Sequence, residues 1–437
     1  MILRPYQLDL INQVKEKFKS EKRIIMCLPT GGGKTVCFCY MLKKTKMKTL
    51  ILSDRIEILE RTQETLNAFN IAAEIISPNH KYDISSQICL GMVETVNKRH
   101  LNELADFDFI IIDEAHKKSF DKLFNHFNDN AFVLGVTATP LPTEMYTSIV
   151  EGVTTQDLIN MKYLSTPSCF GVDVDISGVG MSGGDYSANQ LAQRYSQRKI
   201  YTGVVENYKR LCLGEKALLF APTIKSSIEV CEELKKNGID SRHLDSTMDV
   251  SLRKETLEWF KKTNGVLCNV GICTTGFDLP EIQAVILYRA TKSLALFLQM
   301  IGRGARTTNN KKDFKVLDFG NNFKTHGFWE IDRTWSLIKK DKVKGVPPVK
   351  LCEGCSAMNR LSASTCWHCN KVFKIQSKKI EEVVLKSIVT RNKPNETIWE
   401  AIKREAKTKE DVELIVIRFG YSKGWMWINR HMLKKYV

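Results

Sequence analysis

Three glycines followed by a lysine and a threonine form the first group of residues that could do chemistry. The stretch reads Pro29-Thr30-Gly31-Gly32-Gly33-Lys34-Thr35 and separates an apolar run from a segment with helical periodicity. Consecutive glycines let backbone N–H groups surround an anion, and the start of a helix adds its positive end. Lys34 would then reach the β- and γ-phosphates of a nucleotide such as ATP, and the Thr35 hydroxyl would ligate Mg²⁺. Because Leu28 replaces the glycine usual five places before Gly33, a glycine-rich turn that holds nothing is the alternative.

Two adjacent carboxylates follow a second apolar run. Ile110–Ile112 predict a buried strand whose carboxyl end presents Asp113 and Glu114. If this strand lies near the glycine loop in a parallel sheet, both carboxylates reach the edge where such sheets bind ligands. Asp113 would hold Mg²⁺ through water, and Glu114 would orient and deprotonate the attacking water. The alternative is that the pair caps the next helix.

Two C-x₂-C pairs form the third group. Ten residues separate the pairs, whose members are Cys352, Cys355, Cys366 and Cys369. Four thiolates at this spacing predict a closed, structural Zn²⁺ site that folds a segment too small for its own core. His368 could replace Cys369, although its spacing from Cys366 is less favourable. The other nine of the 13 cysteines are interpreted as buried small hydrophobic residues.

The segments around these groups alternate between predicted strands and predicted helices. One series of apolar strands covers 23–28, 49–52, 107–112 and 131–136, and a second covers 217–220, 265–268, 284–287 and 315–319. Apolar strands that alternate with helices indicate parallel sheets of the α/β type. We therefore expect two α/β domains, at 1–163 and 164–340, a zinc element at 350–372 and a basic, helical C-terminal segment at 373–437.

Composition and charge narrow the class of protein. A hydrophobic content of 43% and a charged content of 26% are typical of a soluble globular protein. The sequence shows no signal peptide and no apolar run long enough to span a membrane, so a cytoplasmic location without membrane partners is expected. The net charge is +16, and residues 331–437 hold 23 lysines and arginines against 11 acidic residues. This excess suggests a polyanionic partner, although a solvated basic surface is the alternative.

Aromatic residues lie among these basic residues near the C terminus. Tyr421, Trp425 and Trp427 alternate with lysines and glycines. Such a pattern can stack bases and bind phosphates of single-stranded nucleic acid, or it can form the core of a small helical domain. The residues leave both interpretations open.

The ordered set of short motifs resembles that of superfamily 2 helicases of the DEAH type. PTGGGKT, DEAH and TATP (137–140) resemble motifs I, II and III, and LRPYQ (3–7) resembles the adenine-sensing motif. LSDRIEILER (52–61) and GMVETVNK (91–98) resemble motifs Ia and Ib. LFAPTIKSS (219–227), NVGICTTGFDLP (269–280) and QMIGRGAR (299–306) resemble motifs IV, V and VI. The resemblance implies two tandem RecA-like domains with a nucleotide bound between them.

The same resemblance implies roles for individual residues. Nucleotide contacts are expected from Arg4, from Gln7 on the adenine, and from Gly276 and Asp278. Coupling between the domains is expected from His116, Thr137, Thr139 and Thr275. Contacts with the nucleic-acid backbone are expected from Arg55, Thr95 and Thr223.

Motif VI also supplies two arginines. Gln299, Arg303 and Arg306 are spaced i, i+4 and i+7, so they would share one face if the segment is helical. They could form a surface salt-bridge patch, or they could bring cations from the second domain to the γ-phosphate. The resemblance implies that Arg306 is the arginine finger, that Arg303 binds the phosphates and that Gln299 faces the attacking water.

The cysteine layout and the tail resemble the RadD and UvsW groups of helicases. This resemblance implies an ATP-dependent DNA helicase or translocase that remodels branched or forked DNA in repair, recombination or replication. Single-stranded DNA and recombination proteins are further expected partners, in the host cytoplasm if a phage encodes the chain. The alternatives are an RNA helicase, a scaffold switched by ATP, and the motor subunit of a nuclease complex.

Overall fold

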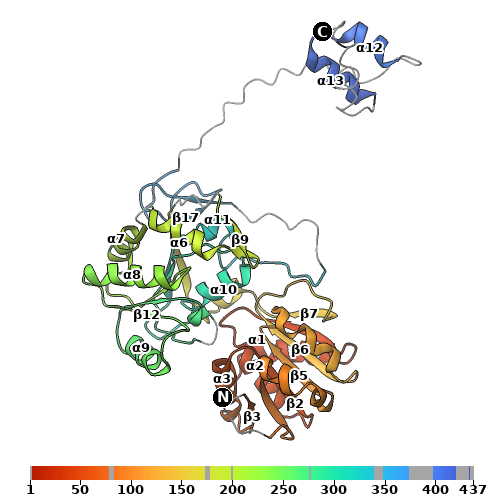
Figure 1. The fold of residues 1–437 in the computed structure, drawn as a ribbon, viewed down its shortest axis with the longest axis vertical. Helices are drawn as coiled ribbons and strands as arrows, with labels where there is room; N and C mark the ends of the chain where they lie inside the picture. The colour runs from red at the N-terminus through yellow and green to blue at the C-terminus, as the bar shows by residue number, and fades with distance from the viewer. Residues whose placement is uncertain are drawn as a thin grey trace. The chain divides into compact units, whose positions relative to one another are not determined.

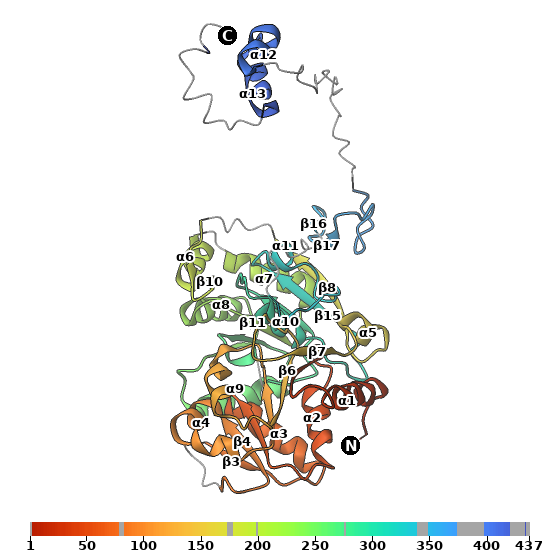
Figure 2. The same ribbon diagram turned by 90° about the vertical axis from the view of Figure 1, so that its right-hand side faces the viewer.

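The computed structural model describes residues 2–77, 83–172, 178–197, 200–274, 277–338, 348–373, 397–419 and 433. The chain divides into two compact units, Met1–Lys374 and Ile375–Val437, which are described separately. Figures 1 and 2 show the ribbon in two views, with the two large sheets of the first unit in separate lobes. We call them lobe 1, which holds the first sheet, and lobe 2, which holds the second.

Lobe 1 is built on seven parallel strands in the order β3-β4-β2-β5-β6-β1-β7. They are β1 (Arg23–Cys27), β2 (Thr49–Ser53), β3 (Glu74–Ile76), β4 (Ile88–Met92), β5 (Phe109–Asp113), β6 (Phe132–Thr137) and β7 (Ser148–Glu151). The helices are α1 (Pro5–Lys17), α2 (Lys34–Leu42), α3 (Ile56–Asn67) and α4 (Val93–Arg99), with two 3₁₀ segments at Asn102–Asp106 and Lys118–His126. The central strands are apolar throughout because helices cover both faces of such a sheet.

Lobe 2 repeats this architecture with six parallel strands in the order β12-β13-β11-β14-β15-β8. They are β8 (Thr166–Gly171), β11 (Ala217–Phe220), β12 (Ser241–Leu244), β13 (Val266–Asn269), β14 (Ala284–Leu287) and β15 (Asp313–Asp318). Its helices are α6 (Ala188–Gln197), α7 (Ile200–Cys212), α8 (Ile224–Lys236), α9 (Val250–Lys262), α10 (Leu294–Gly302) and α11 (Asn322–His326). Helix α5 (Thr155–Asn160) lies between β7 and β8, a 3₁₀ turn covers Ile272–Thr274, and β9 (Met181–Ser182) pairs with β10 (Asp185–Tyr186). The predicted fold class, two parallel-sheet α/β domains, is confirmed.

The cysteine-rich element docks on the edge of the second sheet. Its strands β16 (Val349–Leu351) and β17 (Met358–Arg360) form an antiparallel hairpin. Phe170 of the edge strand β8 bridges to Ala357, and its ring packs against those of Trp367 and His368. Figure 2 shows the hairpin next to β8. The element therefore covers an edge that would otherwise leave backbone groups unpaired.

The C-terminal unit contains two short helices, α12 (Ile398–Glu405) and α13 (Lys409–Arg418). Each begins with a capping box, from Thr397 and from Thr408, which satisfies free N–H groups of the first turn. A small apolar cluster of Ile398, Ala401, Ile402, Val412, Ile415, Val416 and Leu433 joins them. The aromatic residues predicted to stack bases, Tyr421, Trp425 and Trp427, lie outside the described residues. Of the described helices, none is long and apolar enough to cross a membrane.

Candidate nucleotide site between two lobes

The glycine loop connects β1 to α2 at the carboxyl edge of the first sheet. Gly33 is the N-cap of α2, and both Gly31 and Gly33 have a φ of 87°. A Cβ at Gly33 would stand 2.3 Å from Gln7 Nε2, and one at Gly31 would stand 2.8 Å from Leu164 Cδ2. Positive φ and close neighbours therefore both require glycine here. The loop ends at the N terminus of α2, where the N–H groups and the helix dipole favour an anion.

Helix α1 supports the loop from the other side. Gln7 Oε1 accepts from the Arg4 N–H at 2.9 Å, and Gln7 Nε2 donates to Gly32 O at 3.1 Å. Tyr6 donates its hydroxyl to the same carbonyl at 2.8 Å, and the Arg4 guanidinium lies 4.0 Å from the centre of the Tyr163 ring. The residues expected to sense adenine thus contact the glycine loop. The sequence interpretation gave no role to the two tyrosines, although Tyr6 lies within the LRPYQ motif.

The two carboxylates follow β5 in register with the loop. Asp113 pairs with Val136 of β6, and the next residue, Thr137, pairs with Cys27 at the end of β1. Parallel strands therefore bring both motifs to one edge of the sheet, as expected. Burial raises the pKa of the Asp113 carboxyl, and the negative charge of Glu114 raises it further. A divalent cation bound here would favour the ionised carboxylate, so Asp113 with Thr35 fits Mg²⁺.

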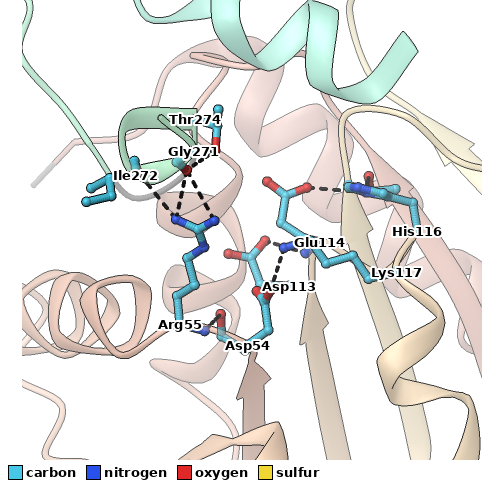
Figure 3. Close-up of polar contacts among 11 residues, drawn as sticks. Asp54, Arg55, Asp113, Glu114, His116, Lys117, Gly271, Ile272 and Thr274 are labelled. Atoms are coloured by element: carbon cyan, nitrogen blue, oxygen red, sulfur yellow. Dashed lines mark hydrogen bonds and ion pairs between the residues drawn. The ribbon is translucent and has the colours of Figure 1, made fainter. Parts of the chain in front are cut away.

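Glu114 has a strained backbone. Its φ is 53°, and its N–H donates to Asp113 Oδ1 at 2.9 Å. A non-glycine residue in this region costs on the order of 1–3 kcal/mol, and such strain clusters at functional sites. The conformation turns the two neighbouring carboxylates in different directions (Figure 3).

His116 links this carboxylate to the strand that follows. Its Nδ1 lies 3.3 Å from Glu114 Oε2 and 2.9 Å from the hydroxyl of Thr137. The same hydroxyl accepts from the N–H of Thr139 at 3.1 Å, and both threonines are buried. Burial lowers the pKa of His116, which favours the neutral imidazole. Three residues expected to couple the lobes are thus connected to Glu114.

The arginines of motif VI do not share a helical face, so that prediction was wrong. Helix α10 ends at Gly302, Arg303 is its C-cap, and Arg306 forms an isolated bridge with Leu164. Gly302 and Gly304 both make close approaches, and a Cβ at Gly302 would stand 2.6 Å from Thr30 Cγ2 of the glycine loop. Gln299 is buried on α10.

The arginine side chains nevertheless meet the glycine loop. Arg306 Nε lies 3.7 Å from the position of a Cβ on Gly31, and Arg306 Nη1 donates to Asp278 Oδ2 at 3.1 Å. Arg303 Nη1 donates to Phe277 O, while its buried Nε has no hydrogen-bond partner among the described residues. Burial, together with the charge of Arg306, lowers the pKa of Arg303 to about 10. An anionic phosphate would relieve this excess of buried positive charge, so these residues fit a nucleotide.

Arg55 occupies the seam between the lobes. Its guanidinium donates to Gly271 O at 3.4 Å and to Ile272 O at 3.3 Å, both in motif V of lobe 2 (Figure 3). Neighbouring Asp54 accepts from Lys117 at 2.6 Å, next to the DEAH segment. The residue predicted to contact nucleic acid therefore contacts the other lobe. A further seam residue, Arg61 of α3, pairs with Asp278; sequence reasoning placed it in motif Ia without a role.

The structure also places the other residues for which the sequence predicted a role in binding. Thr95 is buried on α4, which argues against a nucleic-acid contact by its side chain. Thr223 caps α8, and its hydroxyl accepts from the Ser226 N–H at 3.1 Å. Thr275 and Gly276 lie outside the described residues. Lys34 Nζ donates to Leu28 O at 3.2 Å, close to the loop it is expected to serve.

The four cysteines of the two pairs converge. The Sγ atoms of Cys352, Cys355, Cys366 and Cys369 all lie within 4.8 Å of one another. Two Sγ–Sγ distances are 3.6 Å, close to the ~3.8 Å expected for a tetrahedral Zn²⁺ with thiolate bonds of about 2.3 Å. The ring of His368 packs on Phe170, so Cys369 rather than His368 completes the set.

Hydrogen bonds prepare one of these thiols for a metal. Burial opposes the thiolate of Cys366, but the N–H groups of Cys369 and His368 and the amide of Asn359 lower its pKa to about 6. The cluster therefore fits Zn²⁺. The other nine cysteines are buried and free, as expected.

Two family models match the chain. "Type III restriction enzyme, res subunit" matches residues 1–141, and "Helicase conserved C-terminal domain" matches residues 204–308. A 51.5 kDa protein of Lactococcus phage (isolate 7-9) is 29% identical over 433 residues, which cover 91% of this chain and 92% of that protein. The Saccharomyces cerevisiae protein named "Putative ATP-dependent helicase IRC3" is 29% identical over 73% of this chain, which spans about half (51%) of the yeast protein.

Solved structures share the fold. The HsdR-subunit fragment of a type I restriction enzyme from Vibrio vulnificus YJ016 has a TM-score of 0.58 at 20% identity, covering 73% of this chain and 64% of that one. The ATP-dependent Type ISP restriction-modification enzyme LlaBIII, solved bound to DNA, has a TM-score of 0.54 at 18% identity, covering 73% of this chain and 28% of that one. At these identities the likeness concerns the fold alone.

Proposed function

We propose that this chain, an ATP-dependent helicase of superfamily 2, remodels forked or branched double-stranded DNA. The catalytic assignments belong to this proposal. Lys34 binds the β- and γ-phosphates, Glu114 activates the attacking water, and Arg306 neutralises charge that develops on the γ-phosphate. Mg²⁺ held by Asp113 and Thr35 would supply further charge neutralisation.

The observation that carries this proposal is the approach of Arg306 to Gly31. A cation from lobe 2 lies against the phosphate loop of lobe 1, at 3.7 Å from a Cβ position on Gly31. A γ-phosphate held at that point is contacted from both lobes, whereas ADP lacks the group that Arg306 would hold. Because the nucleotide then has different contacts in the closed and open states, hydrolysis shifts the equilibrium between them. Nucleic acid bound across the lobes moves with that shift.

The DNA assignment is supported by charge and by the relatives. The chain carries a net charge of +16, which favours a polyanion. LlaBIII was solved bound to DNA, and a restriction subunit, that of EcoAI from Escherichia coli, is 25% identical over 72% of this chain. Branched DNA, in preference to plain duplex, rests on the RadD-like cysteine layout.

The test measures ATP turnover and strand displacement on a Holliday junction, a fork, a plain duplex and a structured RNA. We expect the fork or the junction to stimulate turnover most. Stimulation and unwinding by RNA alone would overturn the DNA assignment. Turnover that no nucleic acid stimulates would favour the ATP-switched scaffold.

A second candidate function is the motor subunit of a nuclease complex. The first family model describes a restriction-enzyme subunit, and the chain spans only 46% of the EcoAI subunit. The nuclease would then belong to a partner. Copurification of a nuclease that cuts DNA only with ATP would support this alternative.

A further inference from the structure

Asp278 lies between two guanidinium groups that come from different lobes. Arg306 donates to its Oδ2 at 3.1 Å from within lobe 2, and Arg61 of α3 pairs with the same oxygen from lobe 1. The three side chains are partly buried, with exposed fractions of 36% for Arg61, 21% for Asp278 and 32% for Arg306. One carboxylate oxygen thus serves two cations, of which only Arg306 also faces the glycine loop.

The cluster carries more positive than negative charge. Arg303 is a third guanidinium nearby, and it donates to the carbonyl of Phe277, next to Asp278. The positive charge of Arg306 contributes to the lowered pKa of both Arg61 and Arg303, after burial. This surplus suits an added anion, but the anion must share Arg306 with a carboxylate that repels it.

We propose that Arg61 is a positioning residue that retains Asp278 when the γ-phosphate of ATP takes Arg306. This inference rests on the proposed function, in which Arg306 is the arginine finger. In the structure Asp278 holds both arginines. When ATP binds, Arg306 turns to the γ-phosphate, and Arg61 keeps the carboxylate neutralised and holds the two lobes together. With ADP no exchange occurs, because the γ-phosphate is absent.

The exchange predicts a selective effect. Without Arg61, the only cation that these contacts leave for Asp278 is Arg306, so the carboxylate competes with the γ-phosphate. Loss of Arg61 should therefore weaken binding of ATP but not of ADP. Removing the carboxylate as well should release Arg306 and restore the preference for ATP. An ordinary exposed ion pair would contribute little and would not distinguish the two nucleotides.

The experiment measures the affinities of the full-length chain for ADP and for a non-hydrolysable ATP analogue, both with Mg²⁺. The variants are Arg61→Gln, Asp278→Asn, their combination, and Lys15→Gln, which removes an exposed charge from α1 as a matched control. We expect Arg61→Gln to reduce the ratio of analogue affinity to ADP affinity about 10-fold, a typical coupling between sites. The double variant should recover to within about 3-fold of the unmodified chain, as a double-mutant cycle requires for directly coupled residues.

The possible results distinguish a failure of the Arg61 proposal from a failure of the proposed ATPase function. If Arg61→Gln behaves like Lys15→Gln, or if Asp278→Asn does not rescue it, the exchange is overturned while the ATPase stands. If the unmodified chain hydrolyses no ATP with any nucleic acid, the proposed function itself fails. Circular dichroism confirms that each variant is folded.

Discussion

The two halves of the nucleotide site are built differently. In lobe 1 the phosphate loop, Asp113 and Thr137 sit at the ends of three neighbouring parallel strands, and backbone register fixes their positions. In lobe 2 the arginines follow the end of α10, and side-chain hydrogen bonds to Phe277 O and Asp278 position them. The first half cannot rearrange without breaking a sheet.

The difference indicates which half responds to the nucleotide. Hydrogen bonds to one carbonyl and one shared carboxylate can be exchanged for bonds to a phosphate at little cost, whereas strand pairing cannot. Under the proposed function, lobe 1 is therefore the fixed platform that would bind the nucleotide, and lobe 2 is the part that would sense the γ-phosphate. Disruptions of the platform should abolish binding and turnover together, and disruptions of the sensing half should separate them.

Replacing Lys34 by alanine should have the largest effect. The change removes the cation of the platform, so both phosphate binding and charge neutralisation are lost, and ATP turnover should fall below detection. Steady-state hydrolysis with a DNA fork checks this. Lys43→Ala, at the exposed C-cap of the same helix, is the control and should turn over normally. Normal turnover in Lys34→Ala would contradict the claim that lobe 1 binds the nucleotide phosphates through Lys34.

Replacing Arg306 by alanine should separate binding from turnover. An arginine finger contributes roughly 10³-fold or more to kcat, so turnover should fall by about that factor while ADP affinity stays unchanged. Arg306→Lys should recover little, because lysine lacks the planar fork of donors. Equal losses of ADP binding and turnover would place Arg306 in the platform and erase the distinction.

Lys311 provides a milder disruption of the sensing half. Its buried ammonium donates to Gly304 O at 2.6 Å and to Pro280 O at 2.8 Å, and so ties the arginine segment to the segment of Asp278. Lys311→Met leaves both carbonyls without this donor. We expect kcat to fall about 10-fold, with ADP affinity unchanged, as for loss of about 1–2 kcal/mol of positioning. An unchanged kcat in Lys311→Met would show that the hydrogen bonds of Lys311 are not needed to position the arginines.

The lowered pKa of Lys311 also predicts that the folding stability of the protein depends on pH. Burial lowers the pKa of Lys311 from 10.5 to about 7. Between these values the unfolded chain binds more protons than the folded chain, so this group makes stability rise with pH. Melting temperatures at pH 7.5 and 9.5 measure the rise. It should be larger for the unmodified chain than for Lys311→Met, and equal rises would contradict the assignment.

The cysteine cluster should give the smallest effect on turnover. Its element packs on Phe170 near the end of β8, whereas Ser165, just before β8, donates its N–H to Ala305 O at 2.7 Å, next to Arg306. Cys366→Ser should remove bound zinc, measured by atomic emission, and lower the melting temperature, but reduce kcat only about 2- to 3-fold, since β8 still pairs with β15. Retention of one zinc per chain in this variant would refute the cysteine site.

The sequence predicted most of the inner strands and missed the edge strands. The eight strands expected from apolar runs all occur, with ends within two residues, because Ile, Val and Leu dominate strands that are covered on both faces. The inner strand β4 was not anticipated. The four edge strands, β3, β7, β8 and β12, were not anticipated either. They are short or partly polar, as in Ser241–Leu244, since an edge strand needs less apolar surface.

The candidate nucleotide site also has one part that the sequence predicted and one part that it did not. The platform was predictable because its residues are adjacent in sequence and lie at strand ends. The contacts of the sensing half depend on distant segments: Arg61 and Asp278 are far apart in sequence, as are Arg55 and Gly271. The helical spacing of Arg303 and Arg306 was misleading because α10 ends at Gly302, before both arginines. Such contacts depend on how the two lobes pack against each other, and a local sequence pattern cannot predict that packing.

The most direct test is a structure of the chain with Mg²⁺ and a non-hydrolysable ATP analogue. We predict that the Arg306 guanidinium and the Lys34 ammonium both lie within hydrogen-bond distance of the γ-phosphate, with Asp278 still paired with Arg61. A closed structure in which the γ-phosphate contacts Lys34 alone, and Arg306 remains on Asp278, would contradict the account.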